Sequence, residues 1–126
     1  DGDLDLSLTE GYNIAGRHPL IRNDLPESAR LQSLYVSVTD ADGVANRAGA
    51  EIRIYDVRDE LLGLRMVSTG DGYNSHSNQA VHFGLPGQES VTIEATFLTA
   101  QGRKTQRYEN VRPVDYFGEF ITIRQE

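Results

Sequence analysis

Apolar and polar residues alternate over most of this chain, and the alternation predicts strands. From residue 34 onward, short segments place an apolar residue at every second position, which is the period of a β-strand with one buried face. The apolar positions that share a face are Leu34, Val36 and Val38; Ala50, Ile52 and Ile54; Leu62, Leu64 and Met66; Val81, Phe83 and Leu85; Val91, Ile93, Ala95 and Phe97; and Ile121 and Ile123. Each segment is therefore expected to pack one face on a core and to leave the other in solvent.

Turn signals separate these segments, and no long segment has a helical period. Glycine combined with Asp, Pro or Gln marks turns at residues 40–43, 70–72, 86–87 and 101–102. Residues 58–64 contain helix formers, but the stretch is too short to hold a helix alone, so we expect a turn or a hairpin corner there. The pattern predicts an all-β fold, an antiparallel β-sandwich of Ig-like or jelly-roll-like type with little or no helix.

The N-terminal part of the chain has a different pattern. Leucines at positions 4, 6 and 8 alternate as one strand, but the residues that follow have no sustained period and contain prolines at 19 and 26. We therefore expect residues 1–28 to form a separate N-terminal piece and connector, and residues 29–126 to form the sandwich domain.

Composition narrows the class of protein. The chain has 126 residues, the size of one domain. Its 12 Lys and Arg against 19 Asp and Glu give a net charge of −7, which argues against a surface for nucleic acid or for an anionic membrane. No apolar run approaches the roughly 20 residues of a membrane span. The absence of cysteine excludes disulfides, thiolate zinc sites and cysteine nucleophiles.

No set of residues in the sequence has the spacing of a catalytic motif. The three histidines, His18, His76 and His82, lack the helical spacing of zinc proteases. Glu51 and Glu94 lie on predicted strands and could form a glycosidase pair, but nothing in the sequence pairs them. We therefore expect a protein that is not an enzyme.

Tyrosines offer a different kind of site. Tyr55, Tyr73 and Tyr108 are candidates for stacking on a sugar ring, because an exposed tyrosine presents a flat apolar face with a polar tip. A carbohydrate-binding module is therefore the alternative to a protein-binding module.

Several blocks of the sequence carry motif residues. Residues 42–52 read DGVANRAGAEI, and residues 70–77 read GDGYNSHS, followed by VHFGL at 81–85. Together with the VTI at 91–93 and the later QGR and ENV, these blocks resemble the motifs of ASPIC/UnbV domains. The resemblance runs from about Leu20 to Val114 and departs from the family where residues 97–100 replace its usual Trp-Pro turn.

The residues that match the family motifs have expected structural roles. They are Asn46, Arg47, Gly49, Gly70, Gly72, Tyr73, His82, Phe83 and Gly84. Asn46 is expected to cap a turn, and Arg47 to pair with an acidic neighbour such as Asp42. Gly70 and Gly72 would allow a positive φ, and Gly84 a bulge or close packing. The resemblance supplies no catalytic residues.

The resemblance also implies a context for the chain. ASPIC/UnbV domains follow FG-GAP/VCBS propeller repeats that carry calcium loops, and residues 1–6 are similar to the end of such a loop. Asp1, Asp3 and Asp5 would then be a truncated calcium loop with too few oxygen ligands to hold the ion. We therefore expect no cofactor in this chain, and calcium in the full-length propeller.

The function that the resemblance implies is that of a noncatalytic C-terminal accessory module. It would belong to a secreted, cell-surface or periplasmic propeller protein and mediate protein or matrix contacts. The expected partners are the adjacent propeller and a protein, matrix or glycan ligand whose identity the sequence does not give.

Overall fold

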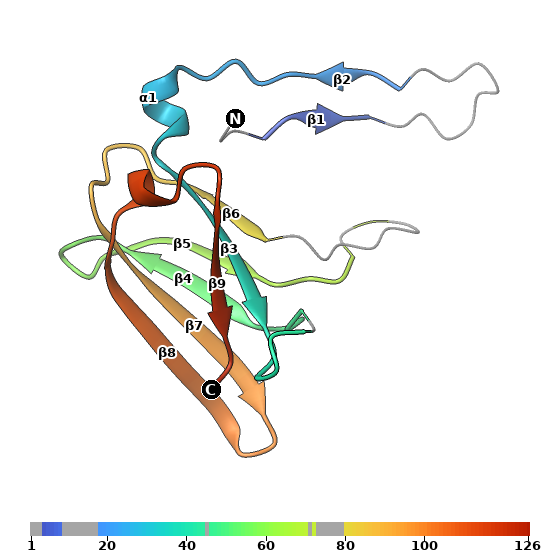
Figure 1. Cartoon of the computed structure of the whole chain (residues 1–126), viewed down its shortest axis with the longest axis vertical. Helices are drawn as coiled ribbons and strands as arrows, with labels where there is room; N and C mark the ends of the chain where they lie inside the picture. Colours follow the sequence, from blue (N-terminus) through green and yellow to red (C-terminus); the bar gives the residue numbers. More distant parts are fainter. Residues whose placement is uncertain (1–3, 9–17, 45, 71, 73–79) are drawn as a thin grey trace.

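The alternating segments form strands in the computed structural model, which describes residues 4–8, 18–44, 46–70, 72 and 80–126 (Figure 1). The strands are β1 (Leu6–Ser7), β2 (Leu20–Ile21), β3 (Ser33–Thr39), β4 (Glu51–Tyr55), β5 (Leu61–Met66), β6 (Val81–Gly84), β7 (Val91–Thr99), β8 (Gly102–Val111) and β9 (Phe120–Arg124). The helical elements of the described residues are one turn of helix, α1 (Glu27–Arg30), and one 3-10 turn, η1 (Pro113–Tyr116). The prediction of an all-β fold with little helix is confirmed.

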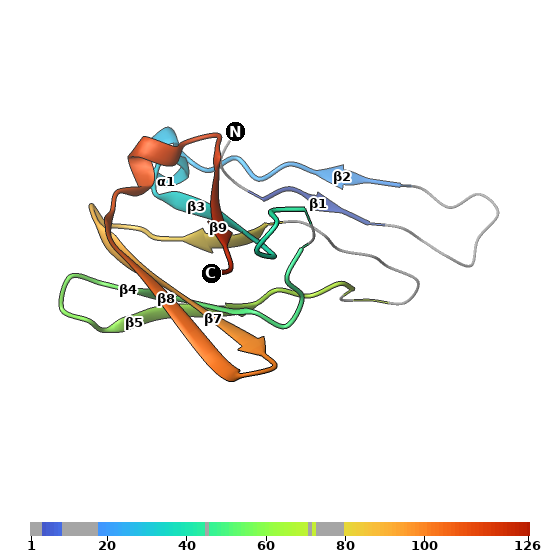
Figure 2. The same cartoon turned by 60° about the horizontal axis from the view of Figure 1, so that its bottom comes forward.

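Two sheets face each other and form the sandwich (Figure 2). One has the strand order β5-β4-β7-β8 and is antiparallel throughout. The other has the order β6-β3-β9, in which β6 is antiparallel to β3 and β9 is parallel to it. The parallel pair departs from the purely antiparallel arrangement that was predicted. All strands of the four-stranded sheet lie between β3 and β9 in the sequence. The chain then returns to the start of β3, so β9 runs in the same direction as β3.

The core lies between these two sheets and contains most of the positions that the alternation predicts. The fully buried apolar residues are Leu34, Val36, Val38, Ala50, Ile52, Ile54, Val67, Phe83, Leu85, Val91, Ile93, Ala95, Phe97 and Ile123. Val81 and Ile121 are partly buried and pack against them. Burial of these side chains is the main favourable contribution to the stability of the fold.

Strand β5 is the place where the predicted burial is wrong. Leu62, Leu64 and Met66 have the alternation of a half-buried strand, yet all three are exposed. The residues of β5 that point to the core are Gly63, which lies against the ring of Phe83, and Arg65, whose guanidinium lies over that ring at 5.5 Å. The apolar set of β5 therefore faces solvent.

The turn before β5 is held by Asp56. The carboxylate of Asp56 accepts the backbone N–H groups of Arg58 and Glu60 at 2.9 and 2.8 Å. These hydrogen bonds, first of all the one from Glu60, lower the pKa of Asp56 below its ordinary value. The predicted turn is thus confirmed at its start, but the chain enters β5 at Leu61, so the turn does not extend to residue 64.

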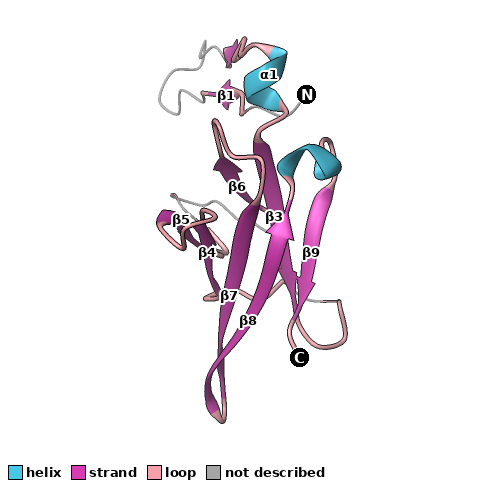
Figure 3. Ribbon diagram, turned by 90° about the vertical axis from the view of Figure 1, so that its left-hand side faces the viewer, coloured by secondary structure: helices cyan, strands magenta, loops and turns pink. Residues whose placement is uncertain are grey.

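Strands β8 and β9 lie side by side at one side of the sandwich (Figure 3). Side-chain hydrogen bonds join β8 to the end of β9. Gln106 of β8 donates from Nε2 to the carbonyl of Arg124 at 3.0 Å, and its Oε1 accepts the N–H of Glu126 at 3.2 Å. Strands β5 and β6 form the edges of their sheets on the other side. The two sides of the sandwich therefore differ in how their strand edges are covered.

Candidate interaction surfaces

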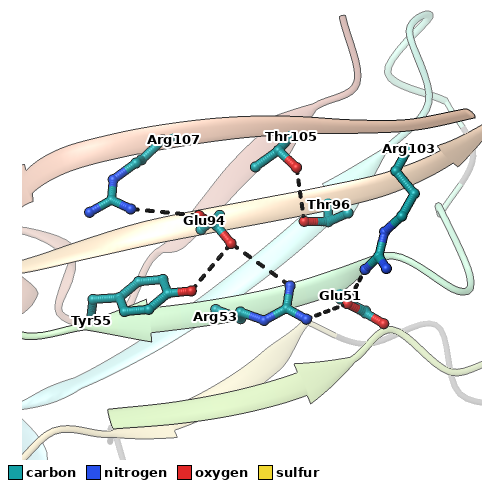
Figure 4. A network of polar contacts seen from close by, with 8 residues as sticks. All are labelled: Glu51, Arg53, Tyr55, Glu94, Thr96, Arg103, Thr105 and Arg107. Atoms are coloured by element: carbon teal, nitrogen blue, oxygen red, sulfur yellow. Dashed lines mark hydrogen bonds and ion pairs between the residues drawn. The ribbon is translucent and has the colours of Figure 1, made fainter. Parts of the chain in front are cut away.

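The outer face of the four-stranded sheet carries a network of charged side chains (Figure 4). The strand register aligns Arg53 of β4, Glu94 of β7 and Arg107 of β8 in one row. Glu94 lies 3.8 Å from Arg53 and 3.6 Å from Arg107, and Glu51 lies 2.6 Å from Arg53 and 2.9 Å from Arg103. Arg107 also pairs with Asp59 of the β4–β5 turn.

This network places the two candidate glycosidase carboxylates on one face. Glu51 and Glu94 lie on neighbouring strands, and Arg53 contacts both of them. Each carboxylate also has a second arginine, Arg103 for Glu51 and Arg107 for Glu94. The acids and bases compensate one another across the sheet, so the surface resembles a cross-strand ion-pair ladder of the kind that stabilises a sheet modestly.

The candidate stacking tyrosines are not brought together. Tyr55 lies on the outer face, opposite Thr92, whereas Tyr108 is paired with Ile93 and lies on the inner side. The guanidinium of Arg107 lies over the ring of Tyr55 at 5.2 Å. Tyr73 is outside the described residues. Tyr55 and Tyr108 therefore cannot form a common platform for one sugar.

The hydroxyl of Tyr55 belongs to the charged network. It donates to Oε1 of Glu94 at 3.3 Å. Burial, and after it the charge of the Glu94 carboxylate, raise the pKa of Tyr55 above its ordinary value of 10.0. The neutral phenol is therefore the form that this surface favours.

The motif residues of the first block have roles other than those expected. Nη2 of Arg47 donates to the carbonyl of Leu98 at 3.0 Å, so this side chain reaches across to β7 instead of pairing with Asp42. Asn46 forms a backbone bridge with Thr39, and its buried Oδ1 has no hydrogen-bond partner among the described residues. The expected turn cap by Asn46 stays a prediction. Gly49 has a φ of +85°, which requires glycine at this turn.

The motif residues of the second block line the three-stranded sheet and the turn before it. Phe83 is buried in the core, as predicted. Gly84 is exposed, and a Cβ there would meet nothing within 4 Å, so close packing does not explain this glycine. Gly70 donates its N–H to Oγ of Ser68 at 3.1 Å, and Gly72 is exposed. Tyr73 of this block lies outside the described residues.

An aromatic cluster lies on the outer face of the three-stranded sheet, and the pattern of the sequence does not predict it. The ring of His82 on β6 lies 4.7 Å from that of Tyr35 on β3, and Tyr35 meets Phe120 of β9 edge to face at 5.9 Å. These residues come from three segments far apart in the chain. Their only sequence signal is that each occupies the solvent-facing phase of its strand, which does not reveal which strands are neighbours.

The N-terminal hairpin carries the described part of the predicted calcium loop. Oδ1 of Asp5 accepts the backbone N–H of Asn23 at 2.9 Å, across the β1–β2 pair. Asp1 and Asp3 lie outside the described residues. Within the described ranges, no three acidic or histidine side chains gather as ligands for a metal ion, and the truncated calcium loop stays a prediction.

A hollow of about 460 Å³ lies between α1, the β6–β7 loop and η1. Leu31, Pro113 and Val114 give it an apolar part, and Gln32, Glu89 and Arg112 contribute polar groups. Arg112 is paired with Asp115 at 3.7 Å. The hollow is an open depression beside the N-terminal connector.

The comparisons with known proteins place the chain in a family. No described helix is long and apolar enough to cross a membrane. A comparison with curated proteins and one with solved structures give no match. A family model, described as ASPIC and UnbV, matches residues 41–117, which is more than half of the chain. The chain therefore belongs to the ASPIC and UnbV family.

Proposed function

We propose that this chain is a noncatalytic accessory module of a longer secreted or cell-surface protein, and that its N-terminal hairpin packs against a neighbouring domain. The observation that carries this proposal is the exposure of the hairpin's apolar residues. These residues are Leu4, Leu6, Leu8, Leu20 and Ile21. Leu6 and Ile21 are register partners and share one face, whereas Leu20 is the partner of Ser7 and lies on the other. An isolated two-stranded hairpin is marginally stable in water, and exposed apolar side chains that gather on it mark a contact site.

The hairpin stands beside the sandwich instead of covering it (Figure 1). Its described hydrogen bonds are internal: Leu8 donates to the carbonyl of Pro19, and Ser7 bonds to His18. The neighbour that would cover the leucines is an FG-GAP/VCBS propeller, which the resemblance of residues 1–6 to the end of a propeller calcium loop suggests. Calcium in that assembly would be held by loops of the propeller.

The noncatalytic part of the proposal is supported by the charged network. Glu51 and Glu94 are the carboxylates best placed for chemistry, and arginines hold both of them. A contact role outside the cell, with protein or matrix as the partner, follows from the family resemblance.

Hydrogen exchange tests the hairpin contact. We expect the amides of residues 6–8 and 20–21 to exchange at least about tenfold more slowly in the longer protein than in this chain, because packing suppresses local opening. The amides of the central strand β7 serve as the control and should exchange alike in both. Equal exchange of the hairpin in the two proteins would contradict the proposal.

A substrate screen tests the absence of catalysis. We expect no turnover of ester or glycoside substrates by the isolated chain. Turnover that disappears in Glu94→Gln while the fold is retained would show that the chain is an enzyme.

A further inference from the structure

Strand β5 is an edge of the four-stranded sheet, and no other strand of the described residues pairs with its outer side. It pairs with β4 on one side, in a regular register from Glu51↔Met66 to Ile54↔Gly63. Just beyond the strand, both backbone groups of Val67 bond toward β4: its N–H to Ala50 and its carbonyl to the N–H of Gly49, each at 2.8 Å. Because backbone direction alternates along an antiparallel strand, the backbone groups of Leu64 and Met66 point away from the sheet.

The side chains on this edge are apolar and exposed. Leu62, Leu64 and Met66 keep 41%, 46% and 63% of their surface in solvent. The opposite edge strand, β8, carries Arg103, Lys104, Arg107 and Glu109, which is how sheet edges are normally protected from pairing. Strand β5 has one charged residue, Arg65, and so lacks the row of charges that would oppose pairing with another strand.

That one charge, Arg65, indicates what the added strand would carry. Arg65 lies on the core side of β5, over the ring of Phe83, and its Nη1 donates to the carbonyl of Leu64 at 2.9 Å. Among the described ion pairs Arg65 takes part in none, whereas Arg53, Arg103 and Arg107 are each paired with a carboxylate. A carboxylate on an added strand would complete the pairing of this row.

We propose that the edge of β5 binds an extended strand of a partner protein that has apolar side chains on one face and a carboxylate on the other. The apolar residues would lie beside Leu62, Leu64 and Met66, and the carboxylate beside Arg65. Main-chain hydrogen bonds to Leu64 and Met66 would supply much of the affinity, and the alternating side chains the specificity, as in other cases of strand addition. This surface is separate from the N-terminal hairpin of the proposed function.

A second copy of the chain fits this edge less well. Each copy has a net charge of −7, which opposes self-association. A standard interface uses about 20–30 residues a side, and β5 offers six. Self-pairing would also place two Arg65 side chains on the same face of the joined sheet without an acid between them.

Peptide binding tests the proposal. The probes are a labelled peptide that alternates leucine with aspartate and a matched peptide that alternates leucine with lysine. We expect the aspartate peptide to bind the chain at least about tenfold more tightly, and Arg65→Glu to reverse this preference. Reversal requires a folded protein, so it separates a lost contact from a lost fold.

Two further variants locate the binding. Leu64→Lys should weaken the aspartate peptide about tenfold or more, because it places a charge in the apolar row. Leu98→Lys, at an even more exposed leucine on β7 of the same sheet (65% against 46% for Leu64), should leave binding unchanged.

Four results would overturn the proposal: no binding of either peptide, equal affinity for both, no reversal in Arg65→Glu, or equal loss in the two lysine variants. Sedimentation of the chain alone completes the test. A dimer that Leu64→Lys abolishes would assign the edge to a second copy instead.

Discussion

Cross-strand neighbours determine the contacts and the pKa of single residues in this domain, and Tyr55 is the clearest case. Its hydroxyl bonds to Glu94, and Arg107 lies over its ring. None of these partners is close in sequence, since Glu94 lies 39 residues away. The charge state of the outer face therefore depends on the strand register.

Glu94→Gln should lower the pKa of Tyr55. Burial is the first cause of the raised pKa, and the charge and the hydrogen bond of Glu94 come next, so the pKa should fall in the variant, in which only burial still raises it and the charges of Arg53 and Arg107 lower it. Absorbance titration of the phenolate, with Tyr55→Phe to identify its contribution, measures the shift. Glu109→Gln is the matched control, because Glu109 pairs with Arg107 at 3.7 Å but does not contact Tyr55. An unchanged pKa in Glu94→Gln would contradict the assigned cause.

The same shift fixes the sign of the pH dependence. The folded state holds the Tyr55 proton more tightly than the unfolded state, so the contribution is fully present below the unfolded pKa of about 10. It is lost as the pH rises through the higher folded pKa. In Glu94→Gln the pKa of Tyr55 differs less between the folded and unfolded states, so the loss of stability that Tyr55 causes at alkaline pH should be smaller. An earlier onset of alkaline unfolding in this variant would come from the other contacts that Glu94 loses.

At the scale of the element, β5 shows what alternation can and cannot predict. The period of two correctly identifies β3, β4, β6, β7 and β9 and the faces that they bury. It also predicts a strand at β5, but it cannot say which of its two faces meets the core. At Gly63 the ring of Phe83 fills the space that a larger side chain would need, and the guanidinium of Arg65 lies over the same ring.

Gly63→Val should therefore destabilise the domain. A Cβ at Gly63 would lie 3.3 Å from Cδ1 of Phe83, a core ring, so the branched side chain would overpack the edge by about 1–3 kcal/mol. Gly84→Val is the control, since a Cβ there meets nothing within 4 Å; it should change the free energy of unfolding by less than about 0.5 kcal/mol. Denaturant unfolding measures both. Equal effects in the two variants would show that contact with Phe83 is not the reason for Gly63.

The candidate site was harder to predict than the fold, for a physical reason. A strand's own sequence specifies which residues share a face, but the ion-pair row and the Tyr35, His82 and Phe120 cluster depend on which strands are neighbours. Strand order is set by packing of the whole chain, including the parallel return of β9 beside β3. The partner of Arg47 differs from the expected one for the same reason, since Arg47 donates to the carbonyl of Leu98, 51 residues away.

At the scale of the whole molecule, the chain divides into a hairpin with internal bonds and a sandwich with its own core. Hydrogen bonds within the N-terminal segment join β1 to β2 and its flanks, as in the contact of Asp5 with Asn23. The connection to the sandwich becomes tight only after α1. There the carbonyl of Gln32 accepts the N–H of Leu85 at 2.7 Å, and its Oε1 accepts the N–H of Gly87 at 2.8 Å.

A truncation that begins at Pro26 should leave the stability of the sandwich unchanged to within about 0.5 kcal/mol. It removes the exposed leucines of the hairpin but no core residue, so binding of a hydrophobic dye should fall as well. A second truncation that begins at Ser33 removes Gln32 and its two hydrogen bonds but keeps all of β3. It should cost about 1–3 kcal/mol, since two amide groups lose their partners. Denaturant unfolding of both proteins beside the full chain measures the difference. If the first truncation already abolished cooperative unfolding, the hairpin would be part of the folding unit and the domain boundary near residue 29 would be wrong.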